Sequence, residues 1–433
     1  MTKSRRDAIK LILATLGYAI NTSDATTKKT QITGSKKIVI IGGGFAGATL
    51  ANTLHTLDKT LHITLIEPNK YYHSCPLGAE YLVGKRTKES LTFSYRNLSN
   101  LKSINVIHDT ATHIDYEKKI ILTKSSGSHS YDRCVVGVGV GYKFDAIEGY
   151  SPEVSKQLPH AWSGGEQHAI LKKQLMSLRD GGNVLISAPS GDYKCPPGPY
   201  ERASLIAEFL KRNKRRSKII ILDGKSDFPK QELFEKAWRE LYGYGTSNSI
   251  IEWISSEKGG VVSAVNPRNK DILTSAGTIR ADILNIIPPQ KAGTFAHFNE
   301  LTGPHGWCPI DTKTFESSIK PYVHVIGDAA YAEMLPKSAF TACVEARVCA
   351  VAIYCLFNNH PIPCPQFMNV CYSLCAENYG ISVFLRYERN IKTNILDIKN
   401  LVKTPLNSTK EDYRKESQFG YGMFNTMTAE AFG

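Results

Sequence analysis

The chain has 433 residues, of which 42% are apolar and 21% charged, and it carries a formal net charge of +13. About two or three domains with a large buried core fit in this length. The ordinary globular composition excludes a disordered chain, a collagen-like fibre and a polytopic membrane protein.

Residues 1–36 are expected to form an export signal followed by a linker. Arg5 and Arg6 precede an apolar run over 11–20, which is too short to span a bilayer. The string SRRDAIK resembles a twin-arginine signal, the type that exports folded proteins already carrying their cofactor. The alternative is an amphipathic N-terminal helix. We therefore expect a periplasmic protein, in which disulfides are permitted.

A complete dinucleotide-binding pattern follows this segment. An apolar run over 38–41 predicts a buried strand, residues 48–57 continue at helical spacing, and a second strand over 62–66 ends in Glu67. Glycines in this order let a pyrophosphate approach a helix N-terminus, and the acid binds a ribose. The glycines of the G-x-G-x-x-G spacing are Gly42, Gly44 and Gly47.

Two later segments favour FAD over NAD as the nucleotide. Residues 131–139 look like the strand that returns to the FAD domain in flavoproteins with two dinucleotide domains. Residues 323–329 look like the late strand of the same proteins, which ends in Gly-Asp. In those proteins the aspartate reaches the ribityl chain of the flavin, so Gly327 and Asp328 are candidate FAD-binding residues here.

A second α/β unit lies between these segments, with strands expected over 183–188 and 218–222. Its turn reads APSGDYKCPPGPYER and has no G-x-G-x-x-G, so we expect no nicotinamide site. The sequence thus predicts an α/β fold with two Rossmann-like domains and a small C-terminal α+β domain. The expected ranges are 37–150 and 290–360 for a discontinuous FAD domain, 151–289 for the second domain, and 361–433 for the C-terminal domain.

Cysteine chemistry is expected at Cys195, which precedes Pro-Pro-Gly-Pro and a predicted helix. A thiol near a helix N-terminus feels the positive end of the helix dipole, which favours the thiolate, and Glu201 could move protons at the same site. The alternative is a buried cysteine that serves only packing. The remaining cysteines have no zinc-ligand spacing and no C-x-x-C-H string occurs, so we expect no metal site and no attached c-type haem.

Several long strings resemble the flavoprotein subunit of flavocytochrome c sulfide dehydrogenase, with sulfide:quinone oxidoreductases as wider relatives. They are CPPGPYERAS, IIEW, NIIPPQKAG, GWCPIDTKTFESSI and CYS…YGISV. The resemblance implies that Cys195 and Cys371 form a redox-active disulfide beside FAD. It also implies that Cys75, eight residues after Glu67, holds FAD covalently through the 8α-methyl group.

The function implied is sulfide oxidation. Hydrosulfide opens the disulfide, two electrons pass to FAD, and they leave singly for haem c on a separate cytochrome c subunit of a heterodimer. Beyond residues 211–216 there is no dense run of Lys or Arg, so nucleic acid is not expected as a partner.

Two alternatives remain open from the sequence. A sulfide:quinone oxidoreductase would share the chemistry but needs an apolar or amphipathic surface to reach quinone. The tail over 410–433 shows no clear apolar face, so no stable membrane insertion is expected. The other alternative is a non-catalytic flavin electron-transfer partner with an idle cysteine pair. An NAD(P)H-linked disulfide reductase is disfavoured, because the second glycine pattern is missing.

Overall fold

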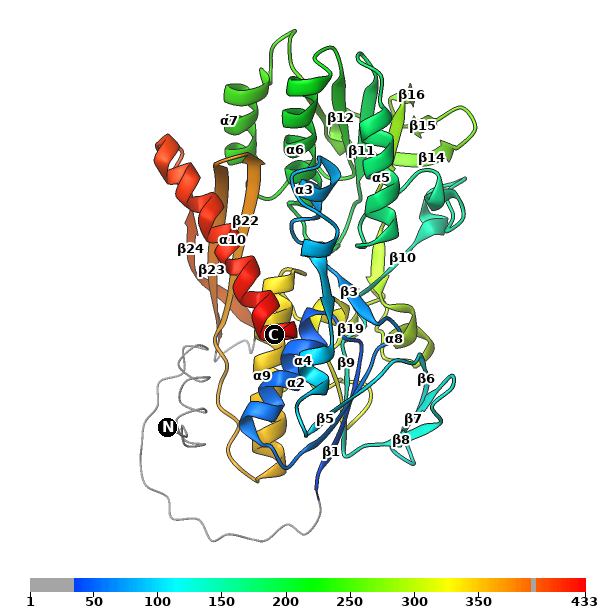
Figure 1. Cartoon of the computed structure of the whole chain (residues 1–433), viewed down its shortest axis with the longest axis vertical. Helices are drawn as coiled ribbons and strands as arrows, with labels where there is room; N and C mark the ends of the chain where they lie inside the picture. The colour runs from blue at the N-terminus through cyan, green and yellow to red at the C-terminus, as the bar shows by residue number, and fades with distance from the viewer. Residues whose placement is uncertain (1–34, 391–394) are drawn as a thin grey trace.

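The computed structural model describes residues 35–390 and 395–433, so the expected twin-arginine signal lies outside the described residues. Three sheets organise this part of the chain: an N-terminal and a central parallel sheet at opposite ends of the long axis, and an antiparallel C-terminal sheet alongside (Figure 1). This arrangement confirms the predicted α/β fold with two dinucleotide-binding-type units and a C-terminal region of strands and a helix.

The N-terminal sheet is parallel and has the strand order β20-β9-β1-β2-β5. Its central strand is apolar on both faces. Ile38 and Ile40 pack with the helices on one side, whereas Val39 and Ile41 face the layer that contains Ile121. The strands are β1 (Lys37–Ile41), β2 (His62–Ile66), β5 (Ile104–Ile107), β9 (Arg133–Val136) and β20 (Val323–Val325).

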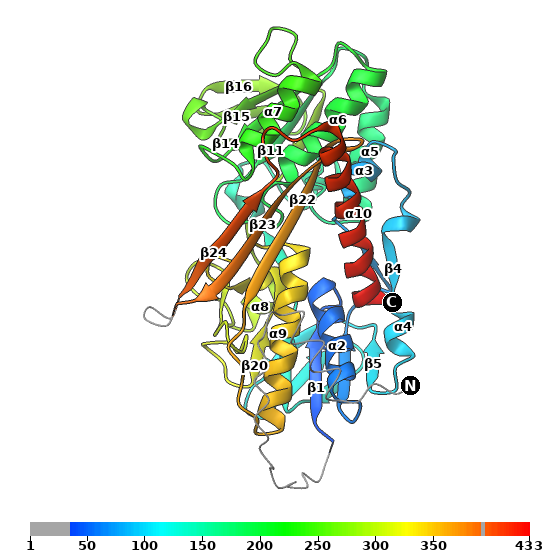
Figure 2. The ribbon, with the colours of Figure 1, turned by 90° about the vertical axis from the view of Figure 1, so that its left-hand side faces the viewer.

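Two helices cover one face of this sheet, α2 (Phe45–Leu57) and α9 (Ala339–Phe357) (Figure 2). Within the described residues, α9 is long and apolar enough to cross a membrane, but 72% of its apolar window is buried inside the protein. It is therefore a core helix. Its cysteines, Cys343, Cys349 and Cys355, are buried in the packing.

The central sheet is also parallel, in the order β13-β12-β11-β17. The chain enters and leaves this unit through β10 (Val140–Tyr142) and β18 (Gln290–Ala292), which pair antiparallel. Helices α5, α6 and α7 belong to this unit (Figure 1). Its elements are α5 (Glu166–Ser177), β11 (Asn183–Ala188), α6 (Gly198–Asn213), β12 (Lys218–Asp223), α7 (Gln231–Tyr242), β13 (Ile251–Ile254) and β17 (Ile283–Ile286).

The C-terminal sheet pairs β22 (Phe367–Ala376), β23 (Tyr379–Arg389) and β24 (Leu396–Lys403), and α10 (Lys410–Phe432) runs alongside it (Figure 2). The sequence-based expectation that this tail lacks an apolar face is wrong. Phe424, Met427 and Phe432 are buried in the structure. The ring of Phe432 stacks on that of Tyr72, with the ring centroids 5.1 Å apart.

Shorter elements complete the described part of the chain. They are β3 (Tyr71–His73), α3 (Gly78–Leu82), β4 (Thr92–Ser94), α4 (Arg96–Ser99), β6 (Ala111–Asp115), β7 (Ile120–Thr123), β8 (Ser128–Ser130), β14 (Val262–Asn266), β15 (Asp271–Thr274), β16 (Gly277–Arg280), α8 (Thr294–Phe298), β19 (Cys308–Pro309) and β21 (Ala330–Tyr331).

Candidate active site

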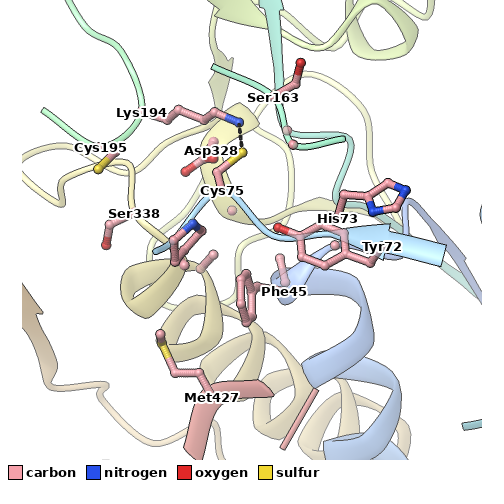
Figure 3. A pocket seen from close by; sticks show the side chains of 18 of the residues that line it. Phe45, Tyr72, His73, Cys75, Ser163, Lys194, Cys195, Asp328, Ser338 and Met427 are labelled. Carbon is pink, nitrogen blue, oxygen red and sulfur yellow. Dashed lines mark hydrogen bonds between the residues drawn. The ribbon is translucent and has the colours of Figure 1, made fainter. Parts of the chain in front are cut away.

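A cavity of about 730 Å³ lies where the three sheets meet, beside the carboxyl ends of the N-terminal strands (Figure 3). In open parallel sheets this edge is where ligands bind. Nine of the ten site residues predicted from the sequence line the cavity, whereas Gly47 lies beneath the lining in the turn. The nine are Gly42, Gly44, Glu67, Cys75, Cys195, Glu201, Gly327, Asp328 and Cys371.

The glycine turn after β1 is shaped for close backbone approach. Gly42 has φ +98°, a conformation that favours glycine, and a Cβ at Gly47 would lie 1.9 Å from Gly42 O. At Gly44, by contrast, the nearest atom to a Cβ would be an aromatic carbon at 3.7 Å, so this backbone faces the open cavity. The turn can therefore admit a pyrophosphate at the N-terminus of α2.

The acid after β2 is tied to this turn. Glu67 is 9% exposed, and its Oε2 accepts a hydrogen bond from Gly43 N at 2.9 Å. Its Oε1 accepts bonds from the backbone and side chain of Asn69 at 2.9 and 2.7 Å. These donors fix the carboxylate beside the glycine turn, where a nucleotide ribose is bound in this type of fold.

Asp328 provides the test of whether the cavity fits FAD. Its Oδ1 is buried and has no hydrogen-bond partner among the described residues. Burial raises the pKa of this carboxyl, although the ammonium groups of Lys194 and Lys337 act in the opposite direction. A chain of hydroxyl groups such as the ribityl of FAD supplies the donors that Asp328 lacks. The residues present therefore fit FAD.

Cys75 lies in the loop after β3 and points into the same cavity. Its Sγ donates to Trp162 O at 3.5 Å and accepts a hydrogen bond from Lys194 Nζ at 3.7 Å (Figure 3). Burial alone would lower the pKa of Lys194, but neighbouring groups that include Cys75 and Asp328 raise it above its ordinary value. The ammonium group of Lys194 is therefore the hydrogen-bond donor to the sulfur of Cys75.

Cys195 precedes α6, as the sequence predicted, and Gly198 N donates to its carbonyl at 2.8 Å. Its backbone has φ +53°, which is unusual for a residue with a side chain. The residue is partly open to the cavity, and for the free thiol its neighbours act against the thiolate that a helix N-terminus favours. Burial, together with Cys371 and Glu201, raises the pKa of Cys195.

Cys371 comes from strand β22, far from Cys195 in the sequence, and both line the cavity. All ten cysteines are free thiols in this structure, so the Cys195–Cys371 disulfide stays a prediction. Lys230 Nζ lies 3.5 Å from Cys371 Sγ and 2.8 Å from Ser373 Oγ.

Glu201 lies on the first turn of α6 and lines the same cavity. Its Oε1 accepts a hydrogen bond from Leu374 N at 2.9 Å. Burial raises the pKa of its carboxyl to about 7, against the opposing effects of Leu374 N–H and Lys230. A carboxyl with this pKa can take up and release protons near neutral pH.

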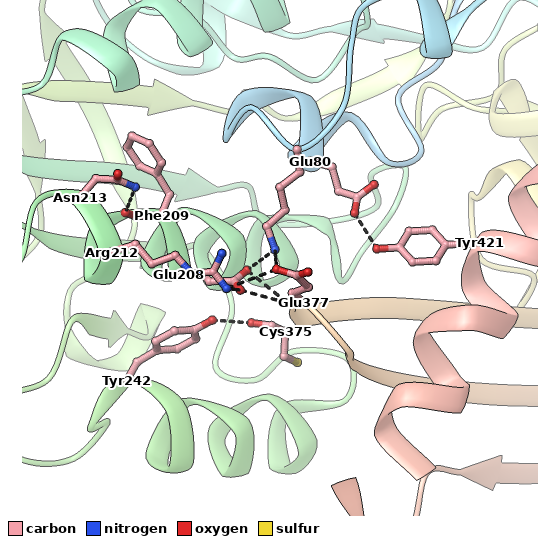
Figure 4. A network of polar contacts seen from close by, with 10 residues as sticks. Glu80, Glu208, Phe209, Arg212, Asn213, Tyr242, Cys375, Glu377 and Tyr421 are labelled. Carbon is pink, nitrogen blue, oxygen red and sulfur yellow. Dashed lines mark hydrogen bonds and ion pairs between the residues drawn. The ribbon is translucent and has the colours of Figure 1, made fainter. Parts of the chain in front are cut away.

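Polar contacts hold the C-terminal sheet against α6 (Figure 4). They fix strand β22, which carries Cys371, relative to the helix that follows Cys195 and carries Glu201. Glu377 N donates to Glu208 of α6 at 3.2 Å, and Arg212 bridges both carboxylates. On the other side, Tyr242 OH donates to Cys375 O at 2.6 Å. Polar contacts therefore hold β22 at both sides.

In the central unit, the acid that would bind the ribose of a second nucleotide is already hydrogen-bonded within the protein. Asp223, at the end of β12, corresponds to the ribose-binding acid of a dinucleotide domain and is 0% exposed. Its carboxylate accepts hydrogen bonds from Tyr200 OH, from Trp253 Nε1 at 3.0 Å and from Lys225 Nζ at 2.8 Å. These side chains occupy the acceptors that a ribose would need.

Sequence reasoning missed the lysines that contact the cysteines, Lys194 beside Cys75 and Lys230 beside Cys371. Lys194 directly precedes Cys195, and that proximity could have singled it out. No local signal marks Lys230, because it reaches Cys371 only through the packing of α7 against β22. Across residues 35–390 and 395–433, no group of three or more His, Cys, Asp or Glu side chains could hold a metal ion.

Three family models match successive parts of the chain. The pyridine nucleotide-disulphide oxidoreductase model matches residues 36–172. The model of the central part of the sulfide dehydrogenase [flavocytochrome c] flavoprotein chain matches residues 168–288. The flavin-binding model of flavocytochrome c sulphide dehydrogenase matches residues 363–432.

Individual proteins and a solved structure are also similar to this chain. The sulfide dehydrogenase [flavocytochrome c] flavoprotein chain of Chlorobaculum thiosulfatiphilum is 44% identical over 45 residues, which are 10% of this chain and 94% of that sequence. The mitochondrial sulfide:quinone oxidoreductase of Mus musculus is 24% identical over 328 residues, which cover 72% of this chain and 68% of that sequence. The solved structure of sulfide:quinone oxidoreductase from Aquifex aeolicus shares the fold, with a TM-score of 0.72, 18% identity and 92% of each chain covered.

Proposed function

The chain belongs to the flavoprotein family of flavocytochrome c sulfide dehydrogenase, and we propose that it oxidises sulfide through a Cys195–Cys371 disulfide. It is an FAD-dependent oxidoreductase of a sulfide-oxidising family. The observation that carries the proposal is that Cys195, from the turn before α6, and Cys371, from strand β22, line the cavity that fits FAD, together with Glu201.

In the proposed reaction, hydrosulfide attacks one sulfur of the disulfide. A new sulfur–sulfur bond forms, the Cys195–Cys371 bond breaks, and the other cysteine leaves as a thiolate. FAD, when bound, accepts an electron pair and can release the electrons one at a time. Glu201 takes the proton of the incoming sulfide, because its pKa of about 7 leaves part of it ionised at neutral pH.

Cys75 is proposed to hold FAD covalently. Its Sγ lies in the cavity beside Lys194, and Asp328 and Glu67 are placed to hold other parts of the cofactor. Acid precipitation of the purified protein tests this directly. A yellow precipitate is expected from the wild type, and from Cys75→Ser the flavin should stay in the supernatant.

The electron acceptor is proposed to be haem c on a cytochrome c subunit, and the complex is proposed to be periplasmic. The family model is named for a flavocytochrome c, and this chain has no C-x-x-C-H string to attach haem itself. The charged N-terminal segment supports export but lies outside the described residues.

The acceptor is tested by comparing turnover with cytochrome c and with a soluble quinone. Faster turnover with quinone would instead favour the sulfide:quinone oxidoreductase reading.

The disulfide chemistry is tested by anaerobic sulfide titration while the flavin absorbance is followed. Cys371→Ser should bind FAD but lose sulfide-dependent bleaching. Cys364→Ser is the matched control, because Cys364 is exposed and does not line the cavity. Equal bleaching in both variants would refute the role of Cys371.

A further inference from the structure

Lys230 is a buried ammonium group placed at the sulfur of Cys371. It is 7% exposed, and its Nζ donates to Cys371 O at 3.0 Å, Cys371 Sγ at 3.5 Å and Ser373 Oγ at 2.8 Å. Its backbone has φ +62°, an unusual conformation for lysine, at the start of α7. Lys230 comes from the central unit and Cys371 from the C-terminal sheet, so the two meet only in the folded protein.

The direct hydrogen-bond partners of this ammonium group are uncharged, and Glu201 acts on it only from a greater distance. Within residues 35–390 and 395–433, no carboxylate lies within 4.0 Å of Lys230 Nζ, and its hydrogen-bond partners are a carbonyl, a hydroxyl and a thiol. Burying a cation without a counter-ion is unfavourable. The partner that can become an anion is Cys371 Sγ, so charge on this sulfur would compensate the buried ammonium.

The other titratable groups around the cysteine pair favour the same distribution of charge. Burial, Cys371 and Glu201 raise the pKa of Cys195, and burial raises the pKa of Cys375, while Lys230 only partly opposes both. Glu201 lies on α6, and the Glu80 carboxylate of α3 accepts from Tyr421 OH of α10 at 2.6 Å. These acidic groups oppose a second negative charge nearby.

We propose that Lys230 is a positioning residue that places the negative charge of the opened Cys195–Cys371 pair on Cys371 and leaves the remaining proton on Cys195. The inference rests on the proposed disulfide. Opening that bond with two electrons and one proton breaks the sulfur–sulfur bond and gives one thiolate and one thiol. In the experiment, dithiothreitol supplies the electrons, and its own two thiols become a disulfide.

The test uses the full holoprotein, reduced anaerobically, freed of reductant and labelled with methyl methanethiosulfonate over a range of pH. Mass spectrometry of peptides gives the labelling rate of each cysteine. In the wild type at neutral pH, Cys371 is expected to react at least about ten times faster than Cys195, since one pKa unit is a factor of ten in thiolate. This order tests the assignment without any variant, and Cys195 reacting first would overturn it.

Three variants test Lys230 itself. Lys230→Met should slow labelling of Cys371 at neutral pH by about tenfold and move its pH profile upward. Lys230→Arg keeps the charge and should restore a profile close to that of the wild type. Lys236→Met is the matched control, because Lys236 lies on the same helix and pairs with Glu240. FAD content and the melting temperature verify folding, and an unchanged profile in folded Lys230→Met would overturn the proposal.

Failure of the proposed function would look different. If the oxidised protein contains no peptide pair joined through Cys195 and Cys371, the disulfide mechanism fails whatever the labelling order. If the joined pair is present and labelling does not depend on Lys230, the disulfide stands and the role of Lys230 fails.

Discussion

Replacing Glu201 with glutamine removes a partly buried carboxyl group while keeping the size of the side chain. The glutamine oxygen can still accept the hydrogen bond from Leu374 N that Glu201 Oε1 accepts at 2.9 Å. In the folded protein, burial raises the pKa of Glu201 from 4.5 to about 7. The substitution therefore isolates the effect of a charge that the fold disfavours.

The size of the effect follows from the two pKa values. Between pH 4.5 and about 7, the folded protein keeps the proton of Glu201 while the unfolded chain has lost it. Stability must then fall as pH rises through this window, by about 3 kcal/mol in total, because each pKa unit corresponds to about 1.4 kcal/mol. Below the window the wild type has no such penalty, and above it the penalty is complete.

Urea unfolding of the wild type and Glu201→Gln at about pH 5.5 and pH 8 measures this difference. Between these two pH values, the free energy of unfolding of the variant should rise by about 2 kcal/mol relative to that of the wild type. This is the share of the total penalty that develops above the lower pH. Glu208→Gln on the same helix breaks the ion pairs with Lys85 and Arg212, so it should be less stable than the wild type at both pH values. An identical difference between Glu201→Gln and the wild type at both pH values would refute the buried-carboxyl reasoning.

Three further predictions concern the cofactor. Gly47→Ala would place a Cβ 1.9 Å from Gly42 O, so the turn must open, and FAD content of the purified protein should fall by at least about tenfold. Asp328→Ala, made in the Cys75→Ser background so that FAD can dissociate, should weaken FAD binding by about tenfold to a hundredfold in equilibrium dialysis, because hydrogen bonds to a carboxylate are lost. Lys194→Met should lower the fraction of FAD that survives acid precipitation while Lys194→Arg preserves it, and equal fractions in both would contradict the contact with Cys75.

The sequence predicted the parts of this protein that depend on local pattern. The continuous apolar run over 38–41 and the glycine spacing after it identify β1, the turn and α2, because each is encoded by neighbouring residues. The segment between β11 and α6 lacks the G-x-G-x-x-G pattern, and in the structure it forms a turn that contains Cys195 and prolines. In such segments, local structure and side-chain pattern agree.

What depends on packing between distant segments was not predictable. Tyr200 and Trp253 fill the position beside Asp223, and no sequence pattern shows that they converge there. The helix N-terminus suggested a low pKa at Cys195, whereas the groups around it in the assembled cavity, Cys371 and Glu201 among them, raise that pKa. The tail over 410–433 shows no clear apolar face in the sequence, because its buried side is defined only where Phe432 packs on Tyr72.

The account depends most directly on the bond between Cys195 and Cys371. Peptide mapping of the oxidised holoprotein under non-reducing conditions, before and after one equivalent of sulfide in the absence of oxygen, measures that bond. We predict a peptide pair joined through the two cysteines that disappears in step with bleaching of the flavin. Recovery of both cysteines as free thiols in the oxidised protein, with sulfide still bleaching the flavin, would contradict the account.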